Sequence, residues 1–248
     1  MSVDAVLFDL DDTLYPYAPC DEAGRRAAFE TYRDRGGDLD ADAFEARRRR
    51  ARRATKREVG GTASAHSRHI YYKRLAEGLP GAFDADLARA LGDAYWDAFL
   101  AEMTAFDDAL DTLDALAEGG VDVAVVTNLT TRIQLRKLAR LGVDGRLDTL
   151  VTSEEVGREK PAAPVFTTAL ARLGRTPAET LVVGNSPAND IEGGNAVGAT
   201  TALFNGPADA TGGGDGHGAG EAAEDPAATL REPDHRLDSL SAVTEVAL

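Results

Sequence analysis

The 248-residue sequence is poor in cysteine and lysine, and it has no long apolar run. Its single cysteine, Cys20, can form no internal disulfide, which suits a reducing compartment. No apolar stretch approaches the ~20 residues that a membrane-spanning helix needs. The first residues show neither the basic region nor the cleavage site of a signal peptide. We therefore expect a cytoplasmic protein with no membrane partner.

Positive charge is also scarce. The chain has 27 Lys and Arg against 42 Asp and Glu, for a formal net charge of −15, and only four of the cations are lysines. This overall charge disfavours broad nucleic-acid binding. An acidic surface rich in aspartate and poor in lysine stays hydrated at high salt, where charge repulsion is screened. We therefore expect a halophilic protein that works in a cytoplasm of high ionic strength.

Acidic residues follow a short apolar run near the N-terminus. Residues 3–8 (VDAVLF) are typical of a strand buried in a parallel sheet, and Asp9 comes directly after them. Asp11 and Thr13 follow two and four residues later. Ligands of open α/β sheets bind outside the carboxyl ends of the strands. The two carboxylates would repel unless a cation or a shared proton intervened, which suits a nucleophile, a general acid/base and a divalent metal.

Two other interpretations apply to acids in such a position. Acids after a strand can simply cap the next helix. A calcium loop of the EF-hand type would need Gly and Glu at the positions of Leu14 and Cys20, so this loop is excluded.

A purely helical pattern follows, in residues 16–104. Glycine pairs and aspartate caps mark the ends of four predicted helices. The first spans 21–35, the second runs from Asp40 or Asp42 to about 59, the third from 62 or 64 to 78, and the fourth begins after Asp84. The pattern predicts a small helical domain, 16–104, inserted into a core formed by residues 1–15 and 105–248.

The core sequence alternates between strands and helices. After the first strand, strands are predicted at 121–126, 149–152, 180–183, 200–204 and, as a last edge strand, 235–237. Helices are predicted at 107–118, 132–141, 164–173 and 191–197, with a final helix after Asp238 or Ser239. Such alternation indicates an α/β fold with a parallel sheet and right-handed crossovers. Residues 205–229, rich in Gly, Ala and acid, are expected to form a flexible loop.

Polar residues also follow three of the later strands. They are Thr127 and Asn128, Lys160, and the segment 184–190 (GNSPAND). Each alone could be a helix cap, a solvated lysine or an ordinary turn. Together with Asp9 they would meet at one edge of the same sheet, which is a much more specific signal.

With these residues the sequence resembles the haloacid dehalogenase-like (HAD) hydrolase superfamily. The four matching motifs are FDLDDTLY, VVTN, EKP with Pro164 and Phe166, and VGNSPANDIEGGNAVG. The resemblance covers nearly the whole chain. It implies a Rossmann-like parallel-sheet core, and it likens the helical insert to the family's C1-type cap.

The resemblance also implies a mechanism. Asp9 would attack phosphorus to form an aspartyl-phosphate, and Asp11 would protonate the leaving oxygen and later activate water. Thr127, backbone amides near Asn128, and Lys160 would hold the phosphoryl oxygens. Dehalogenases of the family lack the second acid, so Asp11 favours hydrolysis of a small phosphorylated metabolite. Phosphoryl transfer, dehalogenation and a non-catalytic phosphate binder remain as alternatives.

A Mg²⁺ ion is the expected cofactor. The resemblance assigns it to the Asp9 carboxylate and the Asp11 carbonyl. Relatives most often carry Asp directly after the glycine of the fourth motif, where this chain has Asn185. An amide oxygen brings no charge, and Asp190 could compensate by binding a metal-bound water.

The sequence does not identify the substrate or choose between monomer and homodimer. Cap positions expected to face the site are 15–17 (YPY), together with His66, Arg68, His69 and Lys73. Tyr71 and Tyr72 are expected in the interior of the cap. A metal bound by His66 and His69 is a weaker alternative.

A basic run interrupts the acidic sequence at 47–57 (RRRRARRATKR). It can be a solvated cap helix paired with acidic neighbours. It can also be an electrostatic funnel for an anionic substrate. A nucleic-acid patch is the third choice, because no aromatic residues are interleaved.

Overall fold

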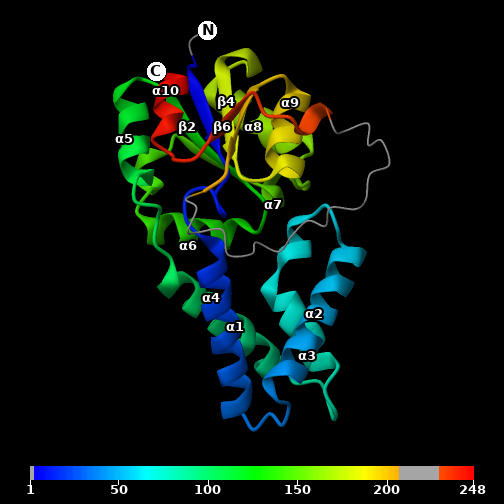
Figure 1. The fold of residues 1–248 in the computed structure, drawn as a ribbon. Coiled ribbons are helices and arrows are strands. Elements are labelled where there is room, and N and C mark those ends of the chain that lie inside the picture. The colour runs from blue at the N-terminus through cyan, green and yellow to red at the C-terminus, as the bar shows by residue number, and fades with distance from the viewer. Residues whose placement is uncertain (1–2, 207–228) are drawn as a thin grey trace. The chain divides into compact units, whose positions relative to one another are not determined.

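The chain forms two compact units in the computed structural model, which describes residues 3–206 and 229–248 (Figure 1). One unit comprises Met1–Tyr17 and Thr104–Leu248, and the other comprises Ala18–Met103. Residues 207–228, most of the expected flexible loop, lie outside the described residues. That the second unit serves as a cap remains a prediction.

The first unit is built on a six-stranded sheet in which every pairing is parallel. The strand order is β3-β2-β1-β4-β5-β6. The strands are β1 (Ala5–Phe8), β2 (Asp122–Thr127), β3 (Thr149–Thr152), β4 (Thr180–Gly184), β5 (Thr200–Phe204) and β6 (His235–Leu237). The predicted α/β fold class is confirmed. The strand of the first motif, β1, lies between β2 and β4, so the residues that follow these three strands meet at one edge.

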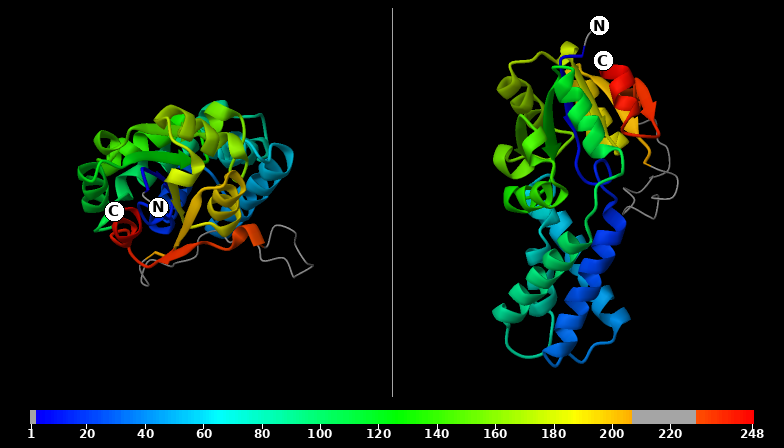
Figure 2. Two further views of the ribbon diagram at one scale, coloured as in Figure 1. Left: turned by 90° about the horizontal axis from the view of Figure 1, so that it is seen from above. Right: turned by 90° about the vertical axis from the view of Figure 1, so that its left-hand side faces the viewer.

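Helices cover both faces of this sheet, as the two views of Figure 2 show. They are α5 (Ala109–Glu118), α6 (Thr131–Leu141), α7 (Ser153–Val156), α8 (Ala163–Leu173), α9 (Glu192–Val197) and α10 (Ala242–Ala247). Phe166 and Leu170 of α8 pack with Leu7 and Val182 of the central strands in one buried cluster. α5 and α10 lie on the opposite face of the sheet (Figure 2). Strands buried on both faces explain the near-continuous apolar runs of the sequence.

The second unit consists of four α-helices and one short 3-10 helix. They are α1 (Tyr17–Asp34), α2 (Ala41–Glu58), η1 (Ala63–His66), α3 (Arg68–Glu77) and α4 (Ala85–Glu102). The Asp40 and Asp84 side chains cap α2 and α4 by accepting from backbone N–H groups, as predicted. α3 begins later than predicted, because Ser67 caps it after the 3-10 turn.

Aromatic side chains form much of the interior of this second unit. Trp96 meets Tyr95 and Phe99 at ring-centroid distances of 5.1 and 5.2 Å. Its side chain is 2% exposed. Tyr71 and Tyr72 are each 1% exposed, so both lie in the interior as predicted.

Two further elements depart from the predictions. A π-helix, Pro187–Ile191, precedes α9, so most of the segment 184–190 is helical and not an ordinary turn. The last helix starts after Ser241 instead of Asp238 or Ser239.

In the two described ranges, no helix combines the length and apolar character that a membrane crossing requires.

Candidate active site

Asp9 lies immediately after the central strand β1. Its backbone N–H donates to the Val183 carbonyl at 2.8 Å, which extends the β1–β4 pairing by one residue. Its side chain is almost fully buried, and Thr13 donates a long hydrogen bond of 3.4 Å to Oδ2. A rigid strand therefore fixes this carboxylate from one side and the following loop fixes it from the other.

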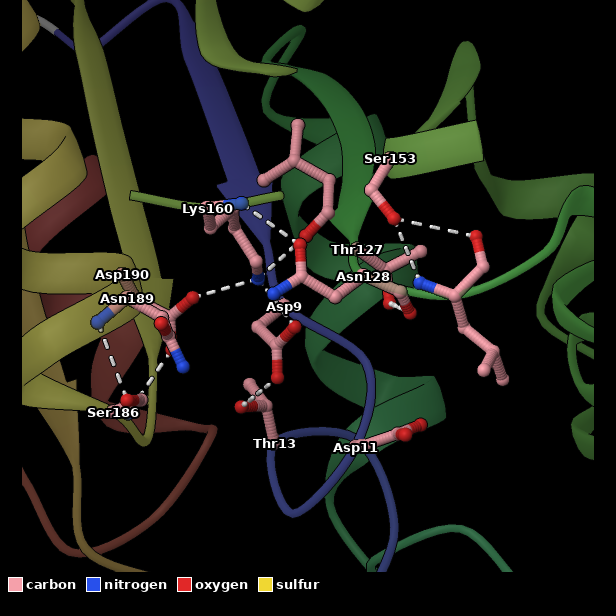
Figure 3. A network of polar contacts seen from close by, with 12 residues as sticks. Asp9, Asp11, Thr13, Thr127, Asn128, Ser153, Lys160, Ser186, Asn189 and Asp190 are labelled. Atoms are coloured by element: carbon pink, nitrogen blue, oxygen red, sulfur yellow. Dashed lines mark hydrogen bonds and ion pairs between the residues drawn. The ribbon is translucent and has the colours of Figure 1, made fainter. Parts of the chain in front are cut away.

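Lys160 connects the first and fourth motifs (Figure 3). Its Nζ donates to Asp9 Oδ1 at 2.5 Å, to Asp190 Oδ1 at 2.6 Å and to the Val126 carbonyl at 2.9 Å. The ammonium group thus binds oxygens that follow or belong to three adjacent strands. The structure brings together the predicted residues Asp9, Lys160 and Asp190.

The charges of this buried cluster do not cancel. When both are ionised, Asp9 and Asp190 carry two negative charges against the one positive charge of Lys160. Burial raises the pKa of Asp9 to about 7, although the adjacent ammonium acts in the opposite direction. Burial alone would lower the pKa of Lys160, but the two carboxylates raise it above its usual value. The lysine is therefore charged, and with both carboxylates ionised the cluster has a net negative charge.

Thr127 is the last residue of β2, and Asn128 follows it beside this cluster. The Asn128 side-chain oxygen accepts from the Lys160 backbone N–H at 2.8 Å, so the second and third motifs are directly bonded. Thr127 is 1% exposed, and its Oγ1 accepts from Gln134 Nε2 at 2.6 Å. Gln134 also donates to the Asn128 carbonyl at 2.9 Å.

Asp11 is held apart from the Asp9–Lys160 pair. Its Oδ1 accepts from Lys137 Nζ at 2.6 Å and from the Tyr15 hydroxyl at 2.8 Å. In the view of Figure 3 its side chain extends away from the Asp9 carboxylate. The two acids of the first motif therefore have different cations as partners, although the charge of Asp11 still contributes to the raised pKa of Asp9.

The fourth motif places Asp190 in the π-helix that follows β4. Asp190 Oδ2 accepts from the Ser186 backbone N–H at 3.0 Å, and its other oxygen accepts from Lys160. A Cβ at Gly184 would overlap the Asp190 carboxyl group, so only glycine lets the strand approach it. Asn185, between them in the chain, is half-buried.

Two residues beside the site have strained backbones. Asp12 has φ 60° and Leu129 has φ 116°, a region that side-chain-bearing residues seldom occupy. Leu129 is held there because its N–H donates to Ser153 Oγ at 2.9 Å. Such strain is common where a loop must place catalytic groups.

Four residues of the site were not predicted in their roles from the sequence. They are Gln134, Lys137, Ser153 and Tyr15, the last of which is a partner of Asp11. A signal for the first two exists, because both lie on the apolar side of the helix 132–141 together with Ile133. A glutamine and a lysine on a buried face usually have a specific partner.

The residues of the helical unit that were predicted to face the site have partners within that unit. His69 Nε2 lies 3.1 Å from Asp93 Oδ1, and Lys73 forms an ion pair with Glu77. The Arg68 guanidinium is buried beside aromatic rings. No cluster of three His, Cys, Asp or Glu residues suited to a metal is present in the described part of the chain, which gives no support to a histidine site.

The basic run forms part of α2. Arg48 is 8% exposed and donates twice to Glu45, at 2.7 and 2.8 Å. Arg49 bonds the same carboxylate, and Arg47 donates to the Gly78 carbonyl. Pairing with acidic neighbours thus accounts for Arg48 and Arg49, while Arg50 and Arg53 are exposed.

Comparisons with known proteins agree on one family. The profile of the family described as haloacid dehalogenase-like hydrolase matches residues 3–198, and one described as HAD-hydrolase-like matches residues 157–243. The chain is 48% identical over 242 residues to a ribulose-1,5-bisphosphate 5-phosphatase from Halopiger xanaduensis, with 98% of each chain covered. It is 35% identical over 199 residues to a glyceraldehyde 3-phosphate phosphatase from Methanopyrus kandleri, covering 80% of this chain and 82% of that one.

A solved structure shares the fold. The HAD-hydrolase YfnB from Bacillus subtilis, bound to magnesium, matches with a TM-score of 0.69 and 20% identity, and 100% of this chain and 99% of that chain are covered. At this level of identity the likeness concerns the fold alone.

Proposed function

The chain belongs to the haloacid dehalogenase-like hydrolase family, and from this premise we propose that it hydrolyses the monoester of a small phosphorylated sugar through an aspartyl-phosphate on Asp9. The observation that carries the proposal is the buried Asp9 carboxylate bonded to Lys160 at 2.5 Å, directly after the central strand. The two phosphatases similar to this chain support the phosphatase branch of the family.

The two Asp9 oxygens have different surroundings. Lys160 holds Oδ1, while Oδ2 has only the long contact of 3.4 Å with Thr13. Oδ2 is therefore the better placed nucleophile. It forms the new bond to phosphorus while the ester P–O bond breaks, and Asp11 gives its proton to the departing alkoxide oxygen.

The second half of the reaction regenerates the enzyme. Asp11, now ionised, takes a proton from water, whose oxygen attacks the phosphorus of the aspartyl-phosphate. The bond between phosphorus and Asp9 breaks, which releases inorganic phosphate and restores both acids. Thr127, the amides near Asn128, and Lys160 stabilise the charge of the transferred group.

The residues present fit a Mg²⁺ ion. The excess negative charge around Asp9 and Asp190 is buried, and carboxylate, amide and carbonyl oxygens are the ligands that Mg²⁺ prefers. We assign it to the Asp9 carboxylate, the Asp11 carbonyl and the Asn185 amide oxygen. Both Asp190 oxygens already accept hydrogen bonds, which suits contact with a metal-bound water. When bound, the ion supplies positive charge against the phosphoryl oxygens.

The central test is phosphate release by Asp9→Asn. The amide cannot act as a nucleophile, so turnover should vanish with and without Mg²⁺. The matched control is Asp107→Asn, which makes the same exchange at an exposed position. Near-normal activity of Asp9→Asn would exclude the aspartyl-phosphate route.

The substrate class needs a separate panel. Ribulose 1,5-bisphosphate and glyceraldehyde 3-phosphate come first because of the two relatives, followed by nucleotides and phosphoglycolate. Halide release from a 2-haloacid is measured in parallel. We expect a phosphorylated sugar to give the highest kcat/KM, and halide release without phosphate release would contradict the proposal.

A further inference from the structure

We propose that the buried polar face of α6, formed by Gln134 and Lys137, positions two motifs for catalysis. Lys137 holds the general acid Asp11, and Gln134 sets the direction of the Thr127 hydroxyl. Both are positioning residues, and the inference rests on the proposed phosphatase function.

Lys137 contacts Asp11 at a distance similar to those between Lys160 and its two carboxylates. Its side chain is 0% exposed, and its Nζ lies 2.6 Å from Asp11 Oδ1. The Tyr15 hydroxyl donates to the same oxygen at 2.8 Å, and the ammonium lies 5.6 Å from the centre of the Tyr15 ring. Two donors that converge on one oxygen restrict the rotamers of the Asp11 side chain. A buried ammonium is costly unless it is paired, so Lys137 is in turn tied to Asp11.

Gln134 acts on the neighbouring motif. Its Nε2 donates to Thr127 Oγ1 at 2.6 Å and to the Asn128 carbonyl at 2.9 Å. Because Oγ1 accepts this bond, the hydroxyl hydrogen must point elsewhere, and the contact of Oγ1 with the Asn128 carbonyl is long, at 3.3 Å. The hydroxyl can therefore turn its hydrogen to an incoming phosphoryl oxygen.

Gln134 fills this position at an energetic cost. In the described parts of the chain its Oε1 is buried and has no hydrogen-bond partner. An apolar side chain would remove that cost, so the amide serves a purpose other than stability. Its bonds to the second motif identify that purpose.

The lysine usage of the chain supports the assignment independently. Only four lysines accompany 23 arginines, and two of the four, Lys137 and Lys160, are buried on carboxylates of the site. An ammonium is a compact point charge, which suits the close contacts of Lys137 with Asp11 and of Lys160 with Asp9 and Asp190.

A purely structural role for Lys137 makes a different prediction from positioning. If Lys137 only stabilises the helix, its loss should reduce the cleavage of all substrates equally. If it positions the general acid, the loss should depend on how much the leaving group needs a proton. An alkoxide needs one, and p-nitrophenolate leaves readily without one.

The first experiment compares kcat/KM of Lys137→Met for the best alkyl phosphate of the panel and for p-nitrophenyl phosphate. We expect a loss of about 10- to 100-fold for the alkyl ester, as for other groups that orient catalytic residues, and a clearly smaller loss for the aryl ester. Arg136→Met removes the same charge from the exposed side of α6 and is the control. Equal losses for both substrates would overturn the role of Lys137.

Gln134→Leu, unlike Lys137→Met, should affect the alkyl and aryl esters equally. It removes the orientation of a phosphate-binding hydroxyl, so both substrates should lose kcat/KM by the same factor, and inhibition by inorganic phosphate should weaken. Unchanged phosphate inhibition in a folded variant would overturn the role of Gln134. The two variants are thus controls for each other.

A double-mutant comparison separates this inference from the proposed function. In an Asp11→Asn background, Lys137→Met should cost little further activity, because Lys137 acts through Asp11. Additive losses would overturn positioning and leave the phosphatase function standing. Failure of the wild type to cleave any phosphate ester would refute the function itself.

Discussion

Single residues of the site are constrained by close packing around Asp190. Gly184→Ala would place a methyl group against the Asp190 carboxyl group and displace it from Lys160. Overpacking of this kind typically costs about 1–3 kcal/mol of stability. We expect a folded protein with a lower melting temperature and strongly reduced turnover, measured by circular dichroism and phosphate release. Wild-type activity would show that the Asp190–Lys160 bond is dispensable.

The uncharged Asn185 leads to a second prediction at the residue scale. Asn185→Asp adds a carboxylate where we assign a Mg²⁺ ligand, so the half-saturating Mg²⁺ concentration should fall. Asn189→Asp adds the same charge nearby in the fourth motif and should change the titration less. An unchanged Mg²⁺ titration of Asn185→Asp would remove Asn185 from the proposed metal site.

The residues of the site could be predicted only in part. Asp9 and Thr127 lie at the ends of apolar runs that could be identified as strands, and parallel strands bring their ends together. Lys160 was predicted to follow a strand directly, but α7 and a loop separate it from β3. Lys137 reaches Asp11 across 126 positions of sequence. Its pairing depends on how α6 lies against the loop after β1, which no local pattern determines. The same holds for the bond between Gln134 and Thr127.

Among the helices, α2 shows how an acidic chain can bury arginine. Burial alone would raise the pKa of Glu45, but hydrogen bonds from Arg48 and Arg49 lower it below its ordinary value of 4.5. A lowered carboxyl pKa contributes stability that is fully present above pH 4.5 and is lost as the pH falls through the lowered value.

Glu45→Gln should therefore destabilise the protein at neutral pH by about 1–3 kcal/mol, since Arg48 loses a charged partner. The difference from wild type should narrow as the pH falls below 4.5. Thermal denaturation between pH 3 and 7 measures this, with the exposed Glu30→Gln as control. A difference that stays constant over this range would contradict the ion-pair argument.

The hypothesis that the basic run of α2 attracts an anionic substrate can be tested on the exposed arginines of this helix. Neutralising Arg48 would disturb a buried pair, so Arg50 and Arg53 are the better choice. If α2 attracts anionic substrate, Arg50→Gln with Arg53→Gln should raise KM at low salt and leave it unchanged at high salt. An unchanged KM at low salt would leave only the solvated-helix interpretation.

Whether a segment is a helix or a strand was predictable because its hydrophobic periodicity is clear. The ends of several helices were not predictable. Glycines and aspartates marked most ends, as Asp40 and Asp84 show. The start of α3 depends on Ser67, which lies between two helical turns and gives no distinct pattern. The π-helix before α9 contains Asp190, which accepts from Lys160, and π-helical turns are often found at functional sites.

At the scale of the whole molecule, the net charge of −15 predicts a dependence on salt. Screening reduces the repulsion between acidic side chains, so stability and activity should rise from low to molar KCl. Melting temperature and turnover across this series test the expectation. Full function without added salt would contradict a halophilic adaptation.

The single tryptophan gives this molecule a built-in optical reporter. Trp96 is buried among aromatic rings within the unit Ala18–Met103, so its emission spectrum monitors that unit alone. Far-ultraviolet circular dichroism monitors the helices of both units. If the two signals change at the same denaturant concentration, the units unfold as one cooperative system; if the emission shifts first, the helical insert melts while the sheet remains intact.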